Sequence, residues 1–267
     1  MPIGNILSKE HINALTVELL QDYHKQTFTE SNIRVFVAGN VEGYDSYFQF
    51  AQCPKEIGSK EDFDIIQCLK KESRKDELVS RKDCKVRFEL RESALQSSLI
   101  LCKNNIGFLH ENRRNFEVLS MIYGGYFGSR LMKNLREEKG YTYNVFCNSI
   151  FYENKALFYI EADVIVEKTK EAIETCYKEM LLLQNELVDE NELSLVKSYM
   201  LGELLRSVDG YVDYQKRYAL WNDFGLDEKE MQMMVDSIRA VTSQNIQTLA
   251  KLYLVPETFT TVVVGKM

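Results

Sequence analysis

The chain has 267 residues, of which 45% are hydrophobic and 27% charged, and its formal net charge at pH 7 is −7. This composition excludes an intrinsically disordered chain and argues against nucleic acid as a partner, because no excess of basic residues is available to bind a polyanion. With only 13 Gly and 3 Pro, the sequence also has too few turn residues for a many-stranded barrel or sandwich. Long helices and strands with few breaks are expected.

Cysteine spacing and the lack of targeting segments indicate the cellular compartment in which the protein is expected. The six cysteines, at positions 53, 68, 84, 102, 147 and 176, form no CxxC pair, so we expect reduced and mostly buried thiols. No signal-like apolar segment opens the sequence, and no run of about 18 apolar residues follows. These patterns favour a cytoplasmic protein that does not bind a membrane.

The first part of the sequence predicts one helix and one strand before an irregular stretch. Apolar residues recur at helical spacing over 16–28, behind Thr16 as the N-cap, and a strand is expected over 33–38, ending at Gly39. Residues 43–84 have no sustained periodicity and contain the charged run KKESRKDE, which is typical of a solvated connector.

The middle of the sequence predicts strands on both sides of two helices. Strands are expected within 86–102, and a hairpin is expected within 143–162. Helices are expected over 113–123 and 130–139; Ser129 is the expected N-cap of the second, and Gly140 its left-handed C-terminal residue.

The last third of the sequence is predominantly helical. We predict helices over about 167–183, from an Asp189-x-x-Glu192 capping box onward, over about 211–222, and from Thr242 to Tyr253. A final strand is expected over 259–264.

The end of the sequence resembles its beginning. Thr16 and Thr242, Lys25 and Lys251, Val37 and Val263, and Gly39 and Gly265 are each 226 positions apart without a gap. This offset indicates a duplicated unit. We therefore predict that 1–42 is the tail of a preceding repeat, that 43–84 is a divergent connector and that 85–267 is the second repeat. The alternative is that helix followed by strand is a common order and that the identities arose by chance.

The sequence offers no metal site of its own. Its three histidines, His11, His24 and His110, lie in unrelated segments, and neither HExxH nor HxxEH is present. A phosphate-binding loop with its lysine and a GxSxG nucleophile motif are also absent. Ser129 is expected to be a helix cap and not a nucleophile, since no His lies near it in the sequence.

One segment has a specific pattern. Residues 124–143, GGYFGSRLMKNLREEKGYTY, closely resemble the GG-x-x-x-SRL-x-x-x-LRE-x-x-GL-x-Y signature of the pitrilysin/insulinase metallopeptidase family, which includes the mitochondrial processing peptidases. Gln96 lies where a Gln commonly precedes the third segment of that family, and Pro2-Ile3-Gly4 resembles the end of a His-Pro-x-Gly stretch. The resemblance covers most of 1–267 apart from 43–84.

The resemblance implies a role without metal on this chain. In that family a zinc-bearing unit with HxxEH faces a similar unit without metal, and the two close over an extended peptide. The second unit contributes an Arg and a Tyr, which here are Arg136 and Tyr143, as substrate-binding and catalytic residues; Gln96 is a further candidate for contact with substrate. Without the resemblance, Arg136 would be expected to pair with a neighbouring carboxylate such as Glu137, and Tyr143 to be half-buried packing.

The resemblance and the pattern of elements predict an α+β fold. A mostly antiparallel sheet from 33–38, 86–102, 143–162 and 259–264 would be covered by long helices largely on one face. The expected partners are a zinc-bearing unit of the same family and a peptide substrate, and self-association into a homodimer is a further expectation. The alternatives are a scaffold or assembly subunit and a free-standing peptide-binding module.

Overall fold

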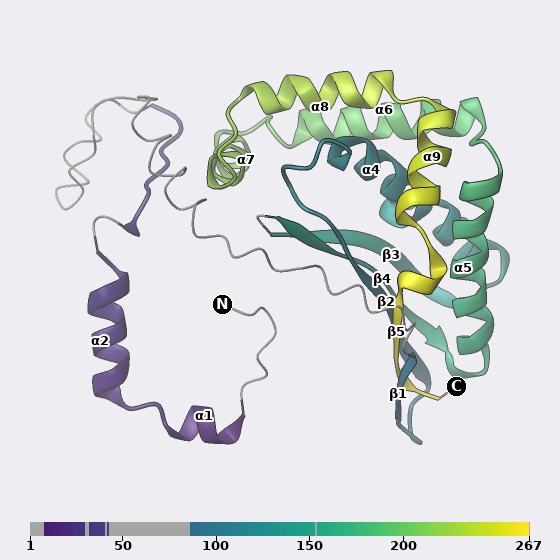
Figure 1. Cartoon of the computed structure of the whole chain (residues 1–267), viewed down its shortest axis with the longest axis horizontal. Coiled ribbons are helices and arrows are strands. Elements are labelled where there is room, and N and C mark those ends of the chain that lie inside the picture. Colours follow the sequence, from purple (N-terminus) through teal and green to yellow (C-terminus); the bar gives the residue numbers. More distant parts are fainter. Residues whose placement is uncertain (1–7, 30–31, 41, 43–85, 153, 267) are drawn as a thin grey trace. The chain divides into compact units, whose positions relative to one another are not determined.

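A computed structural model describes residues 8–29, 32–40, 42, 86–152 and 154–266. The chain divides into two units, residues 1–70 and 71–267 (Figure 1). The predicted connector 43–84 lies outside the described residues, as does the Pro2-Ile3-Gly4 stretch.

The second unit is built on a five-stranded sheet. Its strands are β1 (Val86–Leu90), β2 (Gln96–Ile106), β3 (Thr142–Phe151), β4 (Lys155–Ile165) and β5 (Thr260–Gly265), in the order β1-β5-β2-β4-β3. The pairs β2/β4, β3/β4 and β2/β5 are antiparallel, whereas β1 and β5 are parallel. The predicted α+β fold with a mostly antiparallel sheet is confirmed, and the parallel pair makes the sheet mixed.

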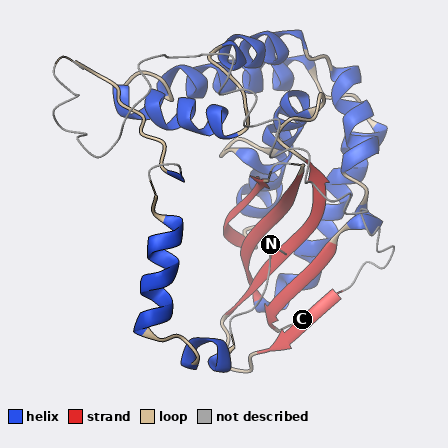
Figure 2. Ribbon diagram, turned by 60° about the vertical axis from the view of Figure 1, so that its left-hand side comes forward, coloured by secondary structure: helices blue, strands red, loops and turns tan. Residues whose placement is uncertain are grey.

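Helices cover one face of this sheet (Figures 1 and 2). The helices of the second unit are α4 (Arg113–Ser120), α5 (Thr169–Asn185), α6 (Glu190–Arg206), α7 (Tyr211–Asp223), α8 (Lys229–Ala240) and α9 (Ser243–Tyr253). Two short π-helical segments, η3 (Met121–Gly125) and η4 (Met132–Glu138), lie between α4 and β3, and the 3₁₀ turns η5 (Val166–Lys168) and η6 (Pro256–Thr258) precede α5 and β5. None of the helices in the described ranges is long and apolar enough to cross a membrane.

The core follows from alternation along the strands. On β4 the residues Ala156, Phe158 and Ile160 are buried while the residues between them are more exposed, as expected for a strand with one covered face. Phe158 meets Phe116 of α4 edge to face at 5.2 Å and Phe259 at 6.1 Å between ring centres. These aromatic contacts join the sheet to its helical layer.

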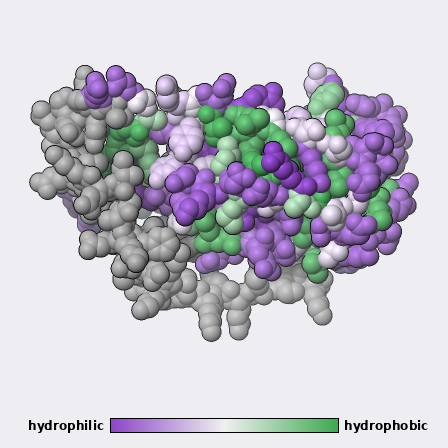
Figure 3. All heavy atoms as spheres, turned by 90° about the horizontal axis from the view of Figure 1, so that it is seen from above, coloured by the Kyte–Doolittle hydropathy of each residue, from purple (hydrophilic) through white to green (hydrophobic). Residues whose placement is uncertain are grey.

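The outer surface of the helical layer is mainly polar. Figure 3 shows the side on which α6 and α8 lie, where hydrophilic residues surround smaller apolar areas. Leu195 and Leu205 of α6 are among the exposed apolar side chains. Scattered apolar residues of this kind are ordinary on a protein surface.

Three cysteines lie in the described part of the chain, and all three are free thiols. Cys147 and Cys176 are buried, and burial raises the pKa of each thiol to about 12. Cys102 is half-buried, and burial raises the pKa of its thiol as well. At neutral pH these thiols are protonated and therefore poor nucleophiles.

Two short helices are described in the first unit, α1 (Lys9–Asn13) and α2 (Val17–Thr27). The predicted strand at 33–38 is wrong, because the structure assigns no strand to these residues. A strand requires a neighbour with which to exchange backbone hydrogen bonds. In the second unit β5 pairs with β1 and β2, whereas the described residues of the first unit contain no strand that could pair with 33–38.

The local geometry of α2 repeats that of α9. Both helices have 11 residues, and their N-caps, Thr16 and Thr242, each accept a hydrogen bond at 3.2 Å from the backbone N–H three residues on. The segments end on glycines with positive φ, 121° at Gly39 and 144° at Gly265. Burial differs: α9 packs against α4 and α5, whereas α2 has no buried residue. The two segments are thus alike in backbone and unlike in burial.

Two predicted helix caps differ from the structure. Asp189 caps α6 through hydrogen bonds from the backbone N–H groups of Asn191 and Glu192, but the Glu192 side chain does not complete the predicted capping box. It accepts instead two hydrogen bonds from Arg130, at 2.8 and 2.7 Å. The hydroxyl of Ser129 is buried and makes no capping hydrogen bond, so the predicted side-chain cap is wrong.

Candidate functional site

The structure brings Arg136 and Tyr143 together. Arg136 lies in the last turn of η4 and Tyr143 is the second residue of β3, with Gly140 between them at φ 64°. The guanidinium carbon of Arg136 lies 4.9 Å from the centre of the Tyr143 ring. This distance is within the range of a cation–π contact.

A third residue completes the arrangement. The Phe127 ring centre lies 4.5 Å from the guanidinium carbon of Arg136, so the cation has two aromatic neighbours. Phe127 is 61% and Tyr143 80% exposed, which is unusual for large aromatic side chains. Sequence reasoning missed Phe127; the one available signal was a large aromatic residue within a glycine-rich turn.

Among the described residues, Arg136 has no acidic partner. None of the ion pairs among the described residues involves Arg136, and the neighbouring Glu137 and Glu138 form none with it. The expected surface ion pair is therefore not present in this part of the chain. The planar N–H donors of the guanidinium remain available for oxygen atoms of another molecule.

The backbone around Tyr143 directs its side chain outward. The pairing of β3 with β4 shifts register between Thr142 and Val145, so Tyr143 and Asn144 lie in a bulge. Thr142 anchors the bulge, because its hydroxyl donates to the carbonyl oxygen of Asp163 at 2.6 Å and accepts from the N–H of Asn144 at 3.1 Å. Bulges often re-aim a side chain in this way, and π-helical turns such as η4 are frequent at functional sites.

Gln96 lies at the same end of the sheet but apart from this pair. It is the first residue of β2, it is exposed, and it pairs with Ile165 at the end of β4. Because β4 lies between β2 and β3, the strands β2 and β3 are roughly 10 Å apart. The structure therefore does not bring Gln96 into contact with Arg136 or Tyr143.

The turn that joins η4 to β3 depends on Gly140. We expect Gly140→Ala to lower the free energy of unfolding by about 1–2 kcal/mol, because an L-residue with a side chain is strained at this left-handed φ. An added Cβ would meet no atom within 4 Å, so crowding does not contribute. Urea unfolding followed by circular dichroism measures the change.

Gly202, within α6, provides a matched control for Gly140. Its added Cβ would also meet no atom within 4 Å, and its backbone is helical. We expect Gly202→Ala to raise stability by about 0.5–1 kcal/mol, because alanine favours a helix interior. If Gly140→Ala and Gly202→Ala changed the free energy of unfolding in the same direction, the left-handed backbone of Gly140 would not be the cause of the effect.

The histidines do not form a metal centre. His11 Nδ1 accepts a hydrogen bond from the N–H of Ser8 at 3.3 Å, and the His24 ring stacks on Phe28 at 4.7 Å. His110 lies in the other unit, before α4. In the described ranges no group of three or more His, Cys, Asp or Glu side chains could hold a metal ion. These residues do not fit a zinc ion.

The sequence belongs to a known peptidase family. Residues 14–200 match the family described as the peptidase M16 inactive domain. The match spans more than half of the chain, so the chain belongs to this family. The predicted resemblance to the non-catalytic half of the pitrilysin/insulinase metallopeptidases is confirmed.

Curated relatives are zinc proteases of greater length. The chain is 24% identical over 245 residues to the uncharacterized zinc protease YmxG of Bacillus subtilis (strain 168), a match covering 91% of this chain and 56% of the relative. It is 21% identical over 253 residues to the uncharacterized zinc protease SCO5738 of Streptomyces coelicolor, covering 90% and 51%. The chain thus spans about half the length of the curated relatives it matches.

Solved structures share the fold. A crystal structure of a protease from Helicobacter pylori superposes with a TM-score of 0.76 at 14% identity, covering 97% of this chain and 61% of that one. A peptidase M16 inactive domain from Pseudomonas fluorescens superposes with a TM-score of 0.64 at 18% identity, covering 69% and 44%. At such identities these structures establish the architecture alone.

Proposed function

We propose that this chain is the substrate-binding, non-catalytic half of a bipartite zinc metalloendopeptidase that acts on extended peptides. The observation that carries the proposal is Arg136, which lies between the exposed rings of Phe127 and Tyr143 without an acidic partner among the described residues. An arginine with this surrounding has hydrogen-bond donors to offer to a ligand. A purely structural surface arginine has no need of two exposed aromatic neighbours.

Each side chain of this group has a distinct task in the proposed site. Arg136 binds carbonyl oxygens of the peptide through its planar N–H donors, and the two rings hold the guanidinium in place. The Tyr143 hydroxyl donates a hydrogen bond to the oxygen on which negative charge develops during peptide-bond hydrolysis. Gln96, about two strand spacings away, contacts the peptide backbone further along the chain of the substrate.

The proposed partner is a zinc-bearing HxxEH unit with the fold of residues 85–267. The histidines here do not fit a metal, and the relatives are zinc proteases roughly twice this length. The resemblance of α2 to α9 supports a division in which 1–42 ends a preceding repeat and 43–84 connects it to the second. Leu20 and Tyr23, which are exposed, occupy the positions of the buried Ile246 and Leu249. They would therefore pack on the partner as their counterparts pack here.

The experiment that tests this function compares the chain alone with the chain plus an HxxEH-bearing unit encoded in the same genome. We expect the purified chain to bind no stoichiometric zinc and to leave a quenched fluorescent peptide intact. Endopeptidase activity should appear only with both units and should be lost with EDTA. Stoichiometric zinc on the isolated chain would overturn the assignment. A complex that binds peptide without cleaving it, or that forms without binding peptide, would favour the peptide-binding or the scaffold alternative.

A further inference from the structure

A cavity lies at the far end of the sheet from Arg136 and Tyr143. Its volume is ≈ 530 Å³, and it is lined by the end of β2, the loop before α4, the β3–β4 turn and Tyr253 of α9. Because β2 extends from Gln96 to Ile106, the cavity is about 30 Å from the site described above. Cavities of a few hundred Å³ commonly hold small ligands or parts of larger ones.

The strongest indication of a ligand is Asn105. Its side chain is buried, at 9% exposure, and neither the amide nitrogen Nδ2 nor the oxygen Oδ1 has a hydrogen-bond partner in the described part of the chain. A buried amide without partners is costly, and most buried polar side chains in proteins are satisfied. Asn105 therefore has a donor and an acceptor to offer to a molecule in the cavity.

Lys103 provides a positive charge beside Asn105. Its ammonium donates one hydrogen bond, to the carbonyl oxygen of Tyr253 at 2.8 Å, which leaves two donors. Burial lowers the pKa of Lys103 to about 8, so the amine is still mostly protonated at pH 7. No acidic residue stands among the described residues that line the cavity. The charge is therefore not neutralised within the cavity.

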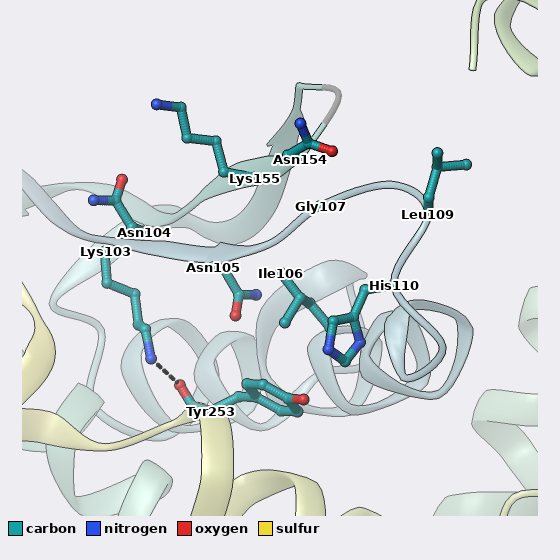
Figure 4. A pocket seen from close by; sticks show the side chains of 10 residues that line it. All are labelled: Lys103, Asn104, Asn105, Ile106, Gly107, Leu109, His110, Asn154, Lys155 and Tyr253. Atoms are coloured by element: carbon teal, nitrogen blue, oxygen red, sulfur yellow. Dashed lines mark hydrogen bonds between the residues drawn. The ribbon is translucent and has the colours of Figure 1, made fainter. Parts of the chain in front are cut away.

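Two further donors point toward the same space. His110 Nδ1 accepts a hydrogen bond from the N–H of Asn112 at 3.1 Å, which leaves Nε2 as the N–H donor of the ring. The Tyr253 hydroxyl accepts from Asn112 Nδ2 at 3.1 Å, which leaves its own proton to donate. Figure 4 shows Lys103, Asn105 and His110 on the side of the strand that faces Tyr253.

We propose that this cavity binds a carboxylate adjacent to an amide, the chemistry shared by a peptide C-terminus and an N-acyl amino acid. Lys103 and His110 bind the carboxylate, because both present donors and Lys103 supplies the opposite charge. Asn105 pairs with the adjacent amide through its donor and its acceptor. Ile106 and the Tyr253 ring provide apolar contact for the neighbouring side chain. This assignment goes beyond the proposed peptidase function and does not depend on it.

The test uses two probes that differ in one group. N-acetyl-leucine carries the carboxylate, whereas N-acetyl-leucinamide has an uncharged amide in its place. In calorimetric titrations of the full chain at pH 7, we expect the carboxylate to bind at least about tenfold more tightly, as for a hydrogen bond to a charged group. Equal affinities, or no binding of either probe at millimolar concentration, would rule the proposal out.

Substitutions locate the binding. Lys103→Met should weaken N-acetyl-leucine about tenfold or more, and Asn105→Leu should weaken both probes. Lys251→Met is the matched control, because Lys251 is exposed on α9 and does not line the cavity. Circular dichroism checks that each variant folds. If a substitution at a buried position prevents folding, His110→Leu provides the second test, because His110 is exposed and leucine has no N–H to donate. An unchanged affinity in that variant contradicts the role of His110.

A pH series and a longer ligand extend the test. As pH rises from 7 to 9, Lys103 loses its proton, because burial lowers its pKa to about 8, so carboxylate affinity should fall. A constant affinity over this range would contradict the role of Lys103. An acetylated tripeptide ending in leucine that binds more tightly than N-acetyl-leucine identifies a peptide C-terminus as the ligand, whereas equal binding identifies a free N-acyl amino acid. All these measurements use the chain without its zinc-bearing partner.

Discussion

Tyr143→Phe is expected to lower kcat/KM by about 10²–10³ in the proposed two-unit peptidase. The substitution retains the aromatic ring next to Arg136 and removes only the phenolic hydroxyl, so the cation–π contact persists. The reduction should appear in kcat with little change in KM, because the hydrogen bond acts on charge that develops during the reaction. Steady-state hydrolysis of a quenched fluorescent peptide measures both constants.

Two controls accompany this prediction. Tyr211→Phe removes a hydroxyl from another highly exposed tyrosine, on α7, and should leave kcat/KM unchanged. Arg136→Lys keeps the charge but loses the planar donor fork, and should chiefly raise KM. If Tyr143→Phe has full activity while Arg136→Lys is impaired, Arg136 binds substrate and the proposed role of the Tyr143 hydroxyl is wrong.

Glu230→Ala is expected to lower the free energy of unfolding by about 3–5 kcal/mol. Glu230 of α8 accepts hydrogen bonds from Arg113 and Arg114 of α4, and the side chains of Glu230 and Arg113 are 1% and 3% exposed. Removing the carboxylate leaves Arg113 buried, with Glu117 at 2.8 Å as its remaining carboxylate partner among the described residues. An uncompensated buried charge is far more costly than a lost surface pair. Urea unfolding followed by circular dichroism gives the difference.

Glu171→Ala is the matched control for this cluster. Glu171 pairs with Lys168 at 3.0 Å, but the side chains are 44% and 42% exposed. Solvent screens such a pair, so the substitution should cost less than about 1 kcal/mol. Glu230→Gln, which keeps the shape of the side chain, separates lost packing from lost charge. Similar costs for Glu230→Ala and Glu171→Ala would show that the buried cluster contributes little.

Features set by neighbouring residues could be predicted from the sequence. Thr16 and Thr242 cap their helices as expected, because a cap involves a side chain and a backbone N–H three residues away. Gly140 has the expected left-handed φ at the end of its helix. Each of these features depends on local geometry.

Features that depend on distant residues were missed. The segment 33–38 has the composition of a strand, yet composition does not supply a pairing partner. Glu192 has the right spacing for a capping box, but Arg130 offers it a two-point ionic contact from another helix. Phe127 contacts Arg136 across a turn, and the separation of these two residues in the sequence does not predict the contact. The signature around Arg136 and Tyr143 could be found only by resemblance.

The position of β5 has a consequence for synthesis on the ribosome. β5, the last strand of the described sheet in chain order, lies between β1 and β2, so two strands made early remain separated until residues 260–265 emerge. Until then the nascent chain presents β1 without its sheet neighbour and β2 with one open edge, which are templates for pairing with other chains. Translation that stops before residue 260 leaves a chain that cannot close its sheet.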